Sequence, residues 1–119
     1  MSTDKVILRD QKAAGEDLSE KQFTLVKITT AGTLVAAASG DRPYINDSTP
    51  KSGEVCTYIV NGIGKVKLGG TVACGDLVAS SNAGVGQKAV SGQFVVGQAL
   101  EKGESGQIIS VLLLPGATA

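Results

Sequence analysis

The chain has 119 residues, which is enough for one domain and short of two. Its 11 basic and 11 acidic residues give a formal net charge of +0, so no long-range field attracts nucleic acid or an anionic membrane, and neither is an expected partner. With 42% hydrophobic residues, the sequence predicts a folded module rather than a disordered chain. Near-zero charge does little to keep copies apart, so self-association or attachment to a larger assembly is tolerated.

The first residues, Met1-Ser2-Thr3-Asp4, lack the basic stretch and the long apolar run of a secretory signal. No apolar run elsewhere reaches the length that a membrane-spanning segment needs. We therefore expect a soluble protein made in the cytoplasm.

Charge is unevenly spread along the chain. Residues 1–22 carry nine of the 22 charged residues, and the other 97 residues carry thirteen. Val6-Ile7-Leu8 is the one short apolar cluster in this segment, and no sustained helical or strand period follows it. The sequence predicts an extended N-terminal arm over 1–22 ahead of a β domain over 23–119. The arm is either a solvated, frayed terminus or a segment that becomes ordered against a partner.

From Phe23 onward, short runs of Val, Ile, Thr and Leu are interrupted by Gly, Asn, Asp, Ser and Pro, a pattern typical of strands and turns. This pattern predicts an all-β domain, and no stretch after Phe23 favours a helix. Residues 39–53 are so rich in turn formers that we expect a long surface loop there. The expected strands are residues 23–29, 33–38, 54–60, 64–68, 76–79, 88–90, 94–100 and 107–114.

Asn61-Gly62 separates two of these strands and is a strong signal for a tight hairpin. On the second strand, Lys65 and Lys67 point to one face, either toward a partner carboxylate or into solvent. The last strand is apolar at both parities, so both of its faces need cover, within one chain or at a subunit interface.

Residues suited to catalysis are scarce. Because the chain has no histidine, a serine or cysteine nucleophile would need lysine or a carboxylate as its base, and no serine lies in a Gly-x-Ser-x-Gly context. Cys56 and Cys74 lack the Cys-x-x-Cys spacing of zinc or redox sites, so we expect two buried free thiols, with a disulfide as the alternative. The glycines of residues 62–70 fit no phosphate-binding spacing. The sequence predicts no catalytic residue, no metal site and no cofactor.

Residues 60–78, VNGIGKVKLGGTVACGDLV, resemble the centre of small capsid cement proteins, the head decoration family of lambda-like tailed phages. The resemblance continues through residues 96–101, the turn at residues 104–106 and the closing strand at residues 108–113, and it covers residues 55–114. The order and spacing of these segments carry it. Residues 1–22 and 39–53 show no match, and Cys74 stands where a small residue such as alanine is usual.

The resemblance implies a small single-domain β-barrel or β-tulip-like sandwich. It also implies a homotrimer on the outer surface of the expanded head, bound to the major capsid protein and stabilising the shell against DNA pressure without catalysis. The alternative is a tail or fibre module, structural or adhesin, although few aromatic residues are available for a sugar site. An enzyme or a biotin or lipoyl carrier domain is a third class. Carrier domains present the modified lysine at an exposed turn, whereas Lys65 and Lys67 of this chain lie within an expected strand.

For this role the arm would add a strand to an exposed capsid sheet edge, and three linked copies would strengthen attachment. The candidate capsid-binding residues of the arm are Val6, Ile7, Leu8 and Arg9. The candidate trimer or shell contacts are Tyr44, Lys65, Lys67 and Leu112.

Overall fold

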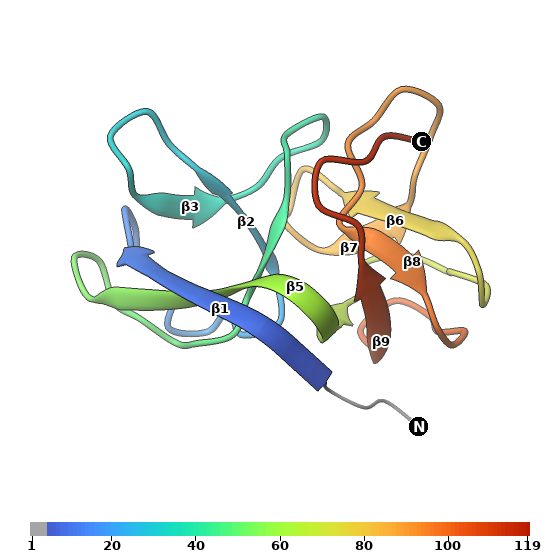
Figure 1. Cartoon of the computed structure of the whole chain (residues 1–119), viewed down its shortest axis with the longest axis horizontal. Helices are drawn as coiled ribbons and strands as arrows, with labels where there is room; N and C mark the ends of the chain where they lie inside the picture. The colour runs from blue at the N-terminus through green and yellow to red at the C-terminus, as the bar shows by residue number, and fades with distance from the viewer. Residues whose placement is uncertain (1–4) are drawn as a thin grey trace.

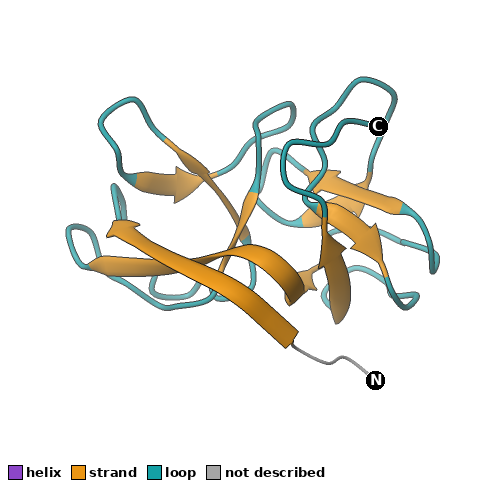
Figure 2. Cartoon of the chain, viewed as in Figure 1, coloured by secondary structure: helices purple, strands orange, loops and turns teal. Residues whose placement is uncertain are grey.

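The computed structural model describes residues 5–119, and the side chains of Lys5 and Ile7 lie outside that description. In this part of the chain Figure 2 shows strands and loops and no helix, so the expected all-β class is confirmed. The strands are β1 (Lys5–Ala13), β2 (Leu25–Ile28), β3 (Leu34–Ala36), β4 (Tyr44–Asn46), β5 (Val55–Lys67), β6 (Leu77–Ser80), β7 (Gly86–Lys88), β8 (Gly97–Ala99) and β9 (Ile108–Leu113).

These strands form one curled antiparallel sheet in the order β3-β2-β4-β5-β9-β8-β6-β7, with β1 added to β5. Ile63 of β5 pairs with Lys5 of β1 and with Leu112 of β9, so β1 and β9 flank opposite edges of β5. The twist of the strands curls the sheet into a half-barrel. Figure 1 shows β1, β2 and β3 on one side and β6 to β9 on the other, with β5 running between them.

The hydrophobic core lies on both faces of the central strands. Leu25 and Val26 of β2 are both fully buried, and because consecutive strand residues point to opposite faces, they enter different clusters. The central cluster consists of Leu25, Ala37, Ile45, Ile59, Val66, Leu68, Val72, Val78, Val96, Ala99, Ile109, Val111 and Leu113. The second cluster consists of Ala14, Leu18, Val26, Leu34, Cys56 and Tyr58.

The N-terminal segment differs from the expected separate arm. Over residues 5–13 it is β1 and pairs with β5, and an isolated bridge joins Ala14 to Leu34. Ala14 and Leu18 are 3% and 0% exposed within the second cluster. Residues 5–22 therefore belong to the domain. Their charged side chains gave the appearance of a solvated arm because an edge strand keeps such side chains in water while its backbone pairs.

The expected surface loop over residues 39–53 contains β4, which pairs with β2 and β5. Ile45 and Asn46 of this strand are both 0% exposed. Asn46 is a turn former by type, but here its side-chain amide donates to the Lys21 carbonyl at 2.9 Å and its Oδ1 accepts the Ser48 N–H at 3.0 Å. Ser48 is a local partner two residues away, but the Lys21 carbonyl comes from tertiary structure, and local composition could not indicate it.

The expected hairpin at Asn61-Gly62 is also wrong, because β5 runs without a break from Val55 to Lys67. A type I′ turn needs positive φ at both central residues. Gly62 has a positive φ of 110°, but Asn61 does not, because Phe23 is the one non-glycine residue with positive φ in the described chain. The register with β1 shifts beside this site, which is typical of a β-bulge. The dipeptide therefore bends a long strand instead of reversing the chain.

Candidate functional site

Lys65, Lys67 and Leu112 lie on one face of the paired strands β5 and β9. Lys67 pairs with Ile108, Lys65 with Ser110 and Ile63 with Leu112, and directly opposite residues of antiparallel strands share a face. The alternate residues point into the central cluster. We refer to the surface made by Lys65, Lys67, Leu100, Ile108 and Leu112 as the outer β5–β9 face.

This face carries three large apolar side chains in solvent. Leu100, Ile108 and Leu112 are 41%, 39% and 38% exposed. Leu100 lies beside β9, because its N–H donates to the Ser110 carbonyl at 3.0 Å. The sequence indicated that both faces of the last strand need cover. Within residues 5–119, Ile109, Val111 and Leu113 are buried on one face, and on the other Ser110 is buried while Ile108 and Leu112 stay exposed.

The two lysines add positive charge to the same face. Within residues 5–119, neither Lys65 nor Lys67 has a carboxylate oxygen within 4.0 Å of its ammonium group. The Lys65 ammonium instead lies 5.9 Å from the centroid of the Phe23 ring, a cation–π contact. The Lys67 N–H donates to the Phe23 carbonyl at 2.8 Å, which holds this loop against the end of β5.

The candidate residues of the N-terminal segment do not form one uniform contact surface. Val6 is half-buried and packs against the central cluster, whereas Leu8 is 52% exposed. The Arg9 guanidinium makes an ion pair with the Asp47 carboxylate at 2.8 Å. The Ile7 side chain lies outside the described residues. Among the candidate residues whose side chains are described, Leu8 and Arg9 thus face solvent, the Arg9 side chain being 46% exposed.

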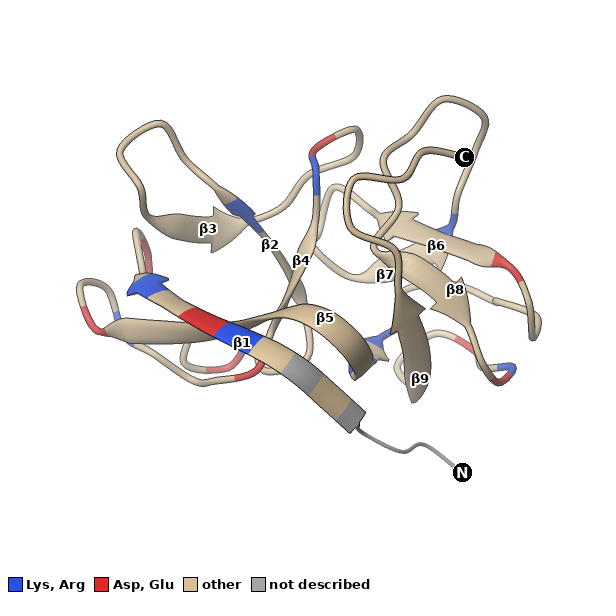
Figure 3. Ribbon diagram, in the orientation of Figure 1, with Lys and Arg blue, Asp and Glu red and all other residues tan. Residues whose placement is uncertain are grey.

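The edge of β1 opposite β5 is open over much of its length. Gln11 lies opposite Thr57 in the register of β1 and β5. The backbone groups of Thr57 point away from β1, because its N–H donates to the Ser48 hydroxyl and its carbonyl accepts from the Asp47 N–H. The Gln11 N–H therefore points away from β5, where it donates to the Asp10 carboxylate at 2.8 Å. Charged side chains along this edge, visible in Figure 3 as blue and red segments of β1, are a common guard against unwanted strand pairing.

A buried tyrosine fastens β1 to β5. The Tyr58 hydroxyl donates to the Asp10 carboxylate at 2.9 Å. Burial, helped by Asp10, raises the pKa of Tyr58 to about 12. Hydrogen bonds from the Gln11 N–H and from Tyr58 lower the pKa of Asp10. The bond thus favours a protonated phenol and an ionised carboxylate.

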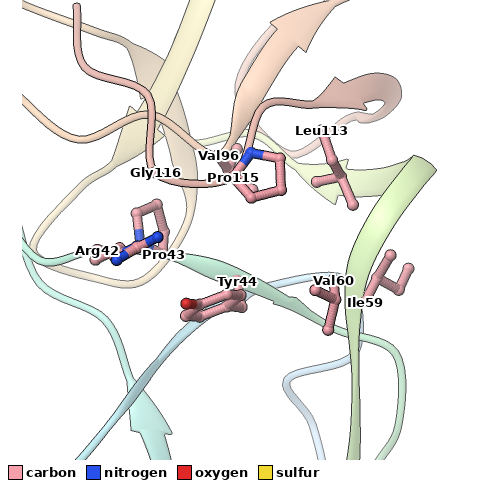
Figure 4. Close-up of a pocket in the computed structure, with 9 residues that line it drawn as sticks. All are labelled: Arg42, Pro43, Tyr44, Ile59, Val60, Val96, Leu113, Pro115 and Gly116. Carbon is pink, nitrogen blue, oxygen red and sulfur yellow. The ribbon is translucent and has the colours of Figure 1, made fainter. Parts of the chain in front are cut away.

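Tyr44, a candidate contact residue, is half-buried and packs against the second cluster. Its ring meets that of Tyr58 edge to face, with centroids 5.5 Å apart. Figure 4 shows Tyr44 at a small pocket with Arg42 and Pro115 across from it. The pocket volume is about 10 Å³, which is room for about one water molecule. Tyr44 thus contributes to packing, and its role as a trimer or shell contact stays a prediction.

Both cysteines are free, so the alternative of a disulfide does not hold. Cys56 is buried as expected, and burial raises the pKa of its thiol, whereas Cys74 is exposed. Residues 5–119 contain no group of three or more Cys, Asp or Glu residues placed to hold a metal ion. The same residues include no helix long and apolar enough to cross a membrane.

Sequence reasoning missed Ile108, Leu100, Phe23 and Gln11 as candidate site residues. Ile108 had a usable signal, because it shares the parity of Leu112 in an apolar strand. Phe23 and Gln11 had no such signal. The contact of the Phe23 ring with Lys65 and the outward direction of the Gln11 N–H both depend on which strands pair.

Curled, single-domain, all-β architecture of this kind occurs in other proteins of known structure. One such structure is the N-terminal base of the head fiber gp8.5 of bacteriophage phi29, with a TM-score of 0.74 over 90% of this chain and 93% of that chain. The two sequences are 16% identical, so the likeness establishes a shared fold. No protein-family model and no curated protein sequence matches the chain.

Proposed function

We propose that the chain is a structural protein of a tailed-phage head. The observation that carries this proposal is the fold shared with the phi29 head fiber base over nine-tenths of both chains. Because one fold can host many functions, a second line of support is needed. The resemblance of residues 55–114 to head decoration proteins supplies it from the sequence.

In its finer form the proposal is a cement protein. The chain binds the major capsid protein on the outside of the expanded head as a homotrimer and holds neighbouring subunits against the pressure of packaged DNA. Three linked copies convert weak contacts into strong attachment, because the second and third contacts form at high effective concentration. The proposal includes no catalysis and no cofactor, and neither nucleic acid nor membrane as a partner.

Attachment uses the open edge of β1. An extended capsid segment pairs with the outward backbone groups of β1, as in other cases of strand addition. Leu8, 52% exposed on the same strand, adds apolar contact. This differs from an arm that becomes ordered on contact, since β1 is already paired with β5 and offers a preformed edge.

A second candidate function is the base of a head fibre. It is favoured by the name of the structural neighbour, which is itself the N-terminal base of such a fiber. A fibre base attaches to the head at particular positions and carries further protein outward, whereas a cement protein covers the shell and strengthens it.

The deciding experiment mixes purified chain with expanded, DNA-filled heads that lack it, sediments the heads and counts the copies bound. Saturable binding in multiples of three per threefold position, with increased resistance of the heads to heat, supports a cement protein. Binding at a few positions without increased resistance supports a fibre base. Absence of binding by well-folded chain overturns both.

A further inference from the structure

We infer that the outer β5–β9 face docks onto a protein surface that combines apolar side chains with carboxylates. The inference rests on the proposed function, in which that surface belongs to the shell, and it names the chemistry of the contact. The open edge of β1 supplies backbone hydrogen bonds without selecting a partner. The outer β5–β9 face supplies the side chains that select one.

The apolar part of the argument is the exposure of three neighbouring side chains. Ile108 and Leu112 stand on the same side of β9, and Leu100 lies beside the Ser110 that separates them. Each is about two-fifths exposed although the chain has an apolar core in which such residues are usually buried. Grouped exposed apolar side chains with a polar rim are typical of interaction sites.

The charged part of the argument selects the partner. Lys65 and Lys67 have no carboxylate partner in residues 5–119, and they share the face with the apolar group. The chain as a whole is neutral, so this positive charge is local rather than a general property of the surface. Two copies that joined through this same face would place like charges together, which is unfavourable, whereas a partner with carboxylates is complementary.

The outer β5–β9 face is also continuous with β1. Lys5, Ile63 and Leu112 form one row across β1, β5 and β9. Figure 1 shows the start of β1, the last part of β5 and β9 along the lower side of the view. A single shell surface that pairs a strand with β1 can therefore reach the lysines and the apolar side chains together.

The test compares two variants with two matched controls. Lys65→Glu/Lys67→Glu reverses the charge, and Ile108→Ser/Leu112→Ser removes the apolar groups. Lys88→Glu and Val90→Ser change an exposed lysine and a 61% exposed valine outside this face. All are first checked for cooperative thermal unfolding. We expect each test variant to bind heads roughly tenfold more weakly or worse, and each control to bind like wild type.

A second readout identifies the partner's chemistry. A carbodiimide that joins amines to carboxylates is added to the complex of chain and heads, and the products are mapped by mass spectrometry. Links from Lys65 or Lys67 to aspartate or glutamate of the shell protein support the inference. Links from these lysines only to a second copy of the chain overturn it. Retention of binding by Lys65→Arg/Lys67→Arg supports a role for charge.

The two proposals fail in different ways. If wild type binds heads and both test variants bind equally well, the inference is overturned and the proposed function stands. If folded wild type does not bind heads, the proposed function fails, and the inference that names the shell as partner fails with it.

Discussion

Ile59 and Val66 lie seven positions apart on β5, yet both side chains enter the central cluster. In a regular strand an odd separation places two residues on opposite faces. The bulge at Asn61-Gly62 restores them to the same face. This change of face lets one long strand build both halves of the curled sheet, with β4 beside its first half and β9 beside its second.

Gly62→Ala is expected to destabilise the protein. Gly62 has φ 110°, where a side chain is strained, and the cost is about 1–2 kcal/mol. Gly70→Ala is the matched control, because an added Cβ there meets nothing within 4 Å and its φ is not positive. The control changes the free energy of unfolding by less than about 0.5 kcal/mol. Urea denaturation of both variants measures the difference, and equal midpoints would contradict the bulge.

Leu18→Ala tests whether the N-terminal segment belongs to the core. Leu18 is 0% exposed, so truncation is expected to cost about 2–5 kcal/mol. Val90→Ala, at a 61% exposed position, serves as the control and changes stability by less than about 0.5 kcal/mol. For the same reason, deletion of residues 1–22 is expected to disrupt the fold. A Leu18→Ala variant as stable as the control would restore the separate arm.

Tyr58→Phe is expected to change how stability depends on alkaline pH. The pKa of Tyr58 is raised to about 12 from an ordinary value of 10, so its contribution is complete below pH 10 and is lost as pH rises toward 12. Wild type therefore loses stability between pH 10 and 12 faster than the variant does. The raised pKa of the Cys56 thiol acts equally in both proteins and cancels in the difference. Identical pH profiles from urea denaturation would show that Tyr58 ionises freely.

The two thiols are expected to react at very different rates. Cys74 is exposed, whereas Cys56 is buried and its raised pKa disfavours the reactive thiolate. A thiol reagent such as Ellman's should modify one group rapidly in native protein and two in denaturant. Cys74→Ser should remove the rapid phase. A rapid phase that survives in this variant would mean that Cys56 is accessible.

Gln11→Pro tests the open edge of β1. Proline is tolerated on an edge strand where the N–H faces outward, so the fold should survive. The variant loses the outward N–H, which donates to the Asp10 carboxylate in the free protein and which an added strand would have to take over. Gln11→Ala keeps the N–H and is the control. In the head-sedimentation assay we expect roughly tenfold weaker binding for the proline variant and wild-type binding for the control. Equal binding of the two would exclude pairing of a capsid strand at Gln11.

Part of the fold was predictable because it depends on local chemistry. Turn-forming residues and β-branched runs located β2, β3, β6, β8 and β9 to within a few residues. The apolar character of both faces of β9 pointed to a surface that the chain leaves exposed at Ile108 and Leu112. That Lys65 and Lys67 share a face followed from the two-residue period of a strand.

The rest depended on strand pairing. Asn61-Gly62 is compatible with a hairpin or a bulge, and the partners of β5, with β1 on one edge and β4 and β9 on the other, decide for the bulge. Asn46 is compatible with a surface turn or a buried strand. Its burial in β4 is possible because its side-chain amide donates to the Lys21 carbonyl.

The sequence by itself determined an all-β chain of neutral charge and without histidine. Tertiary structure alone decided that residues 5–22 belong to the domain, that Cys74 is exposed, and that β1 and β9 lie on opposite edges of β5. The physical reason is that backbone propensity acts over a few residues. Burial and edge pairing depend on contacts between segments far apart in the chain, such as Asp10 with Tyr58.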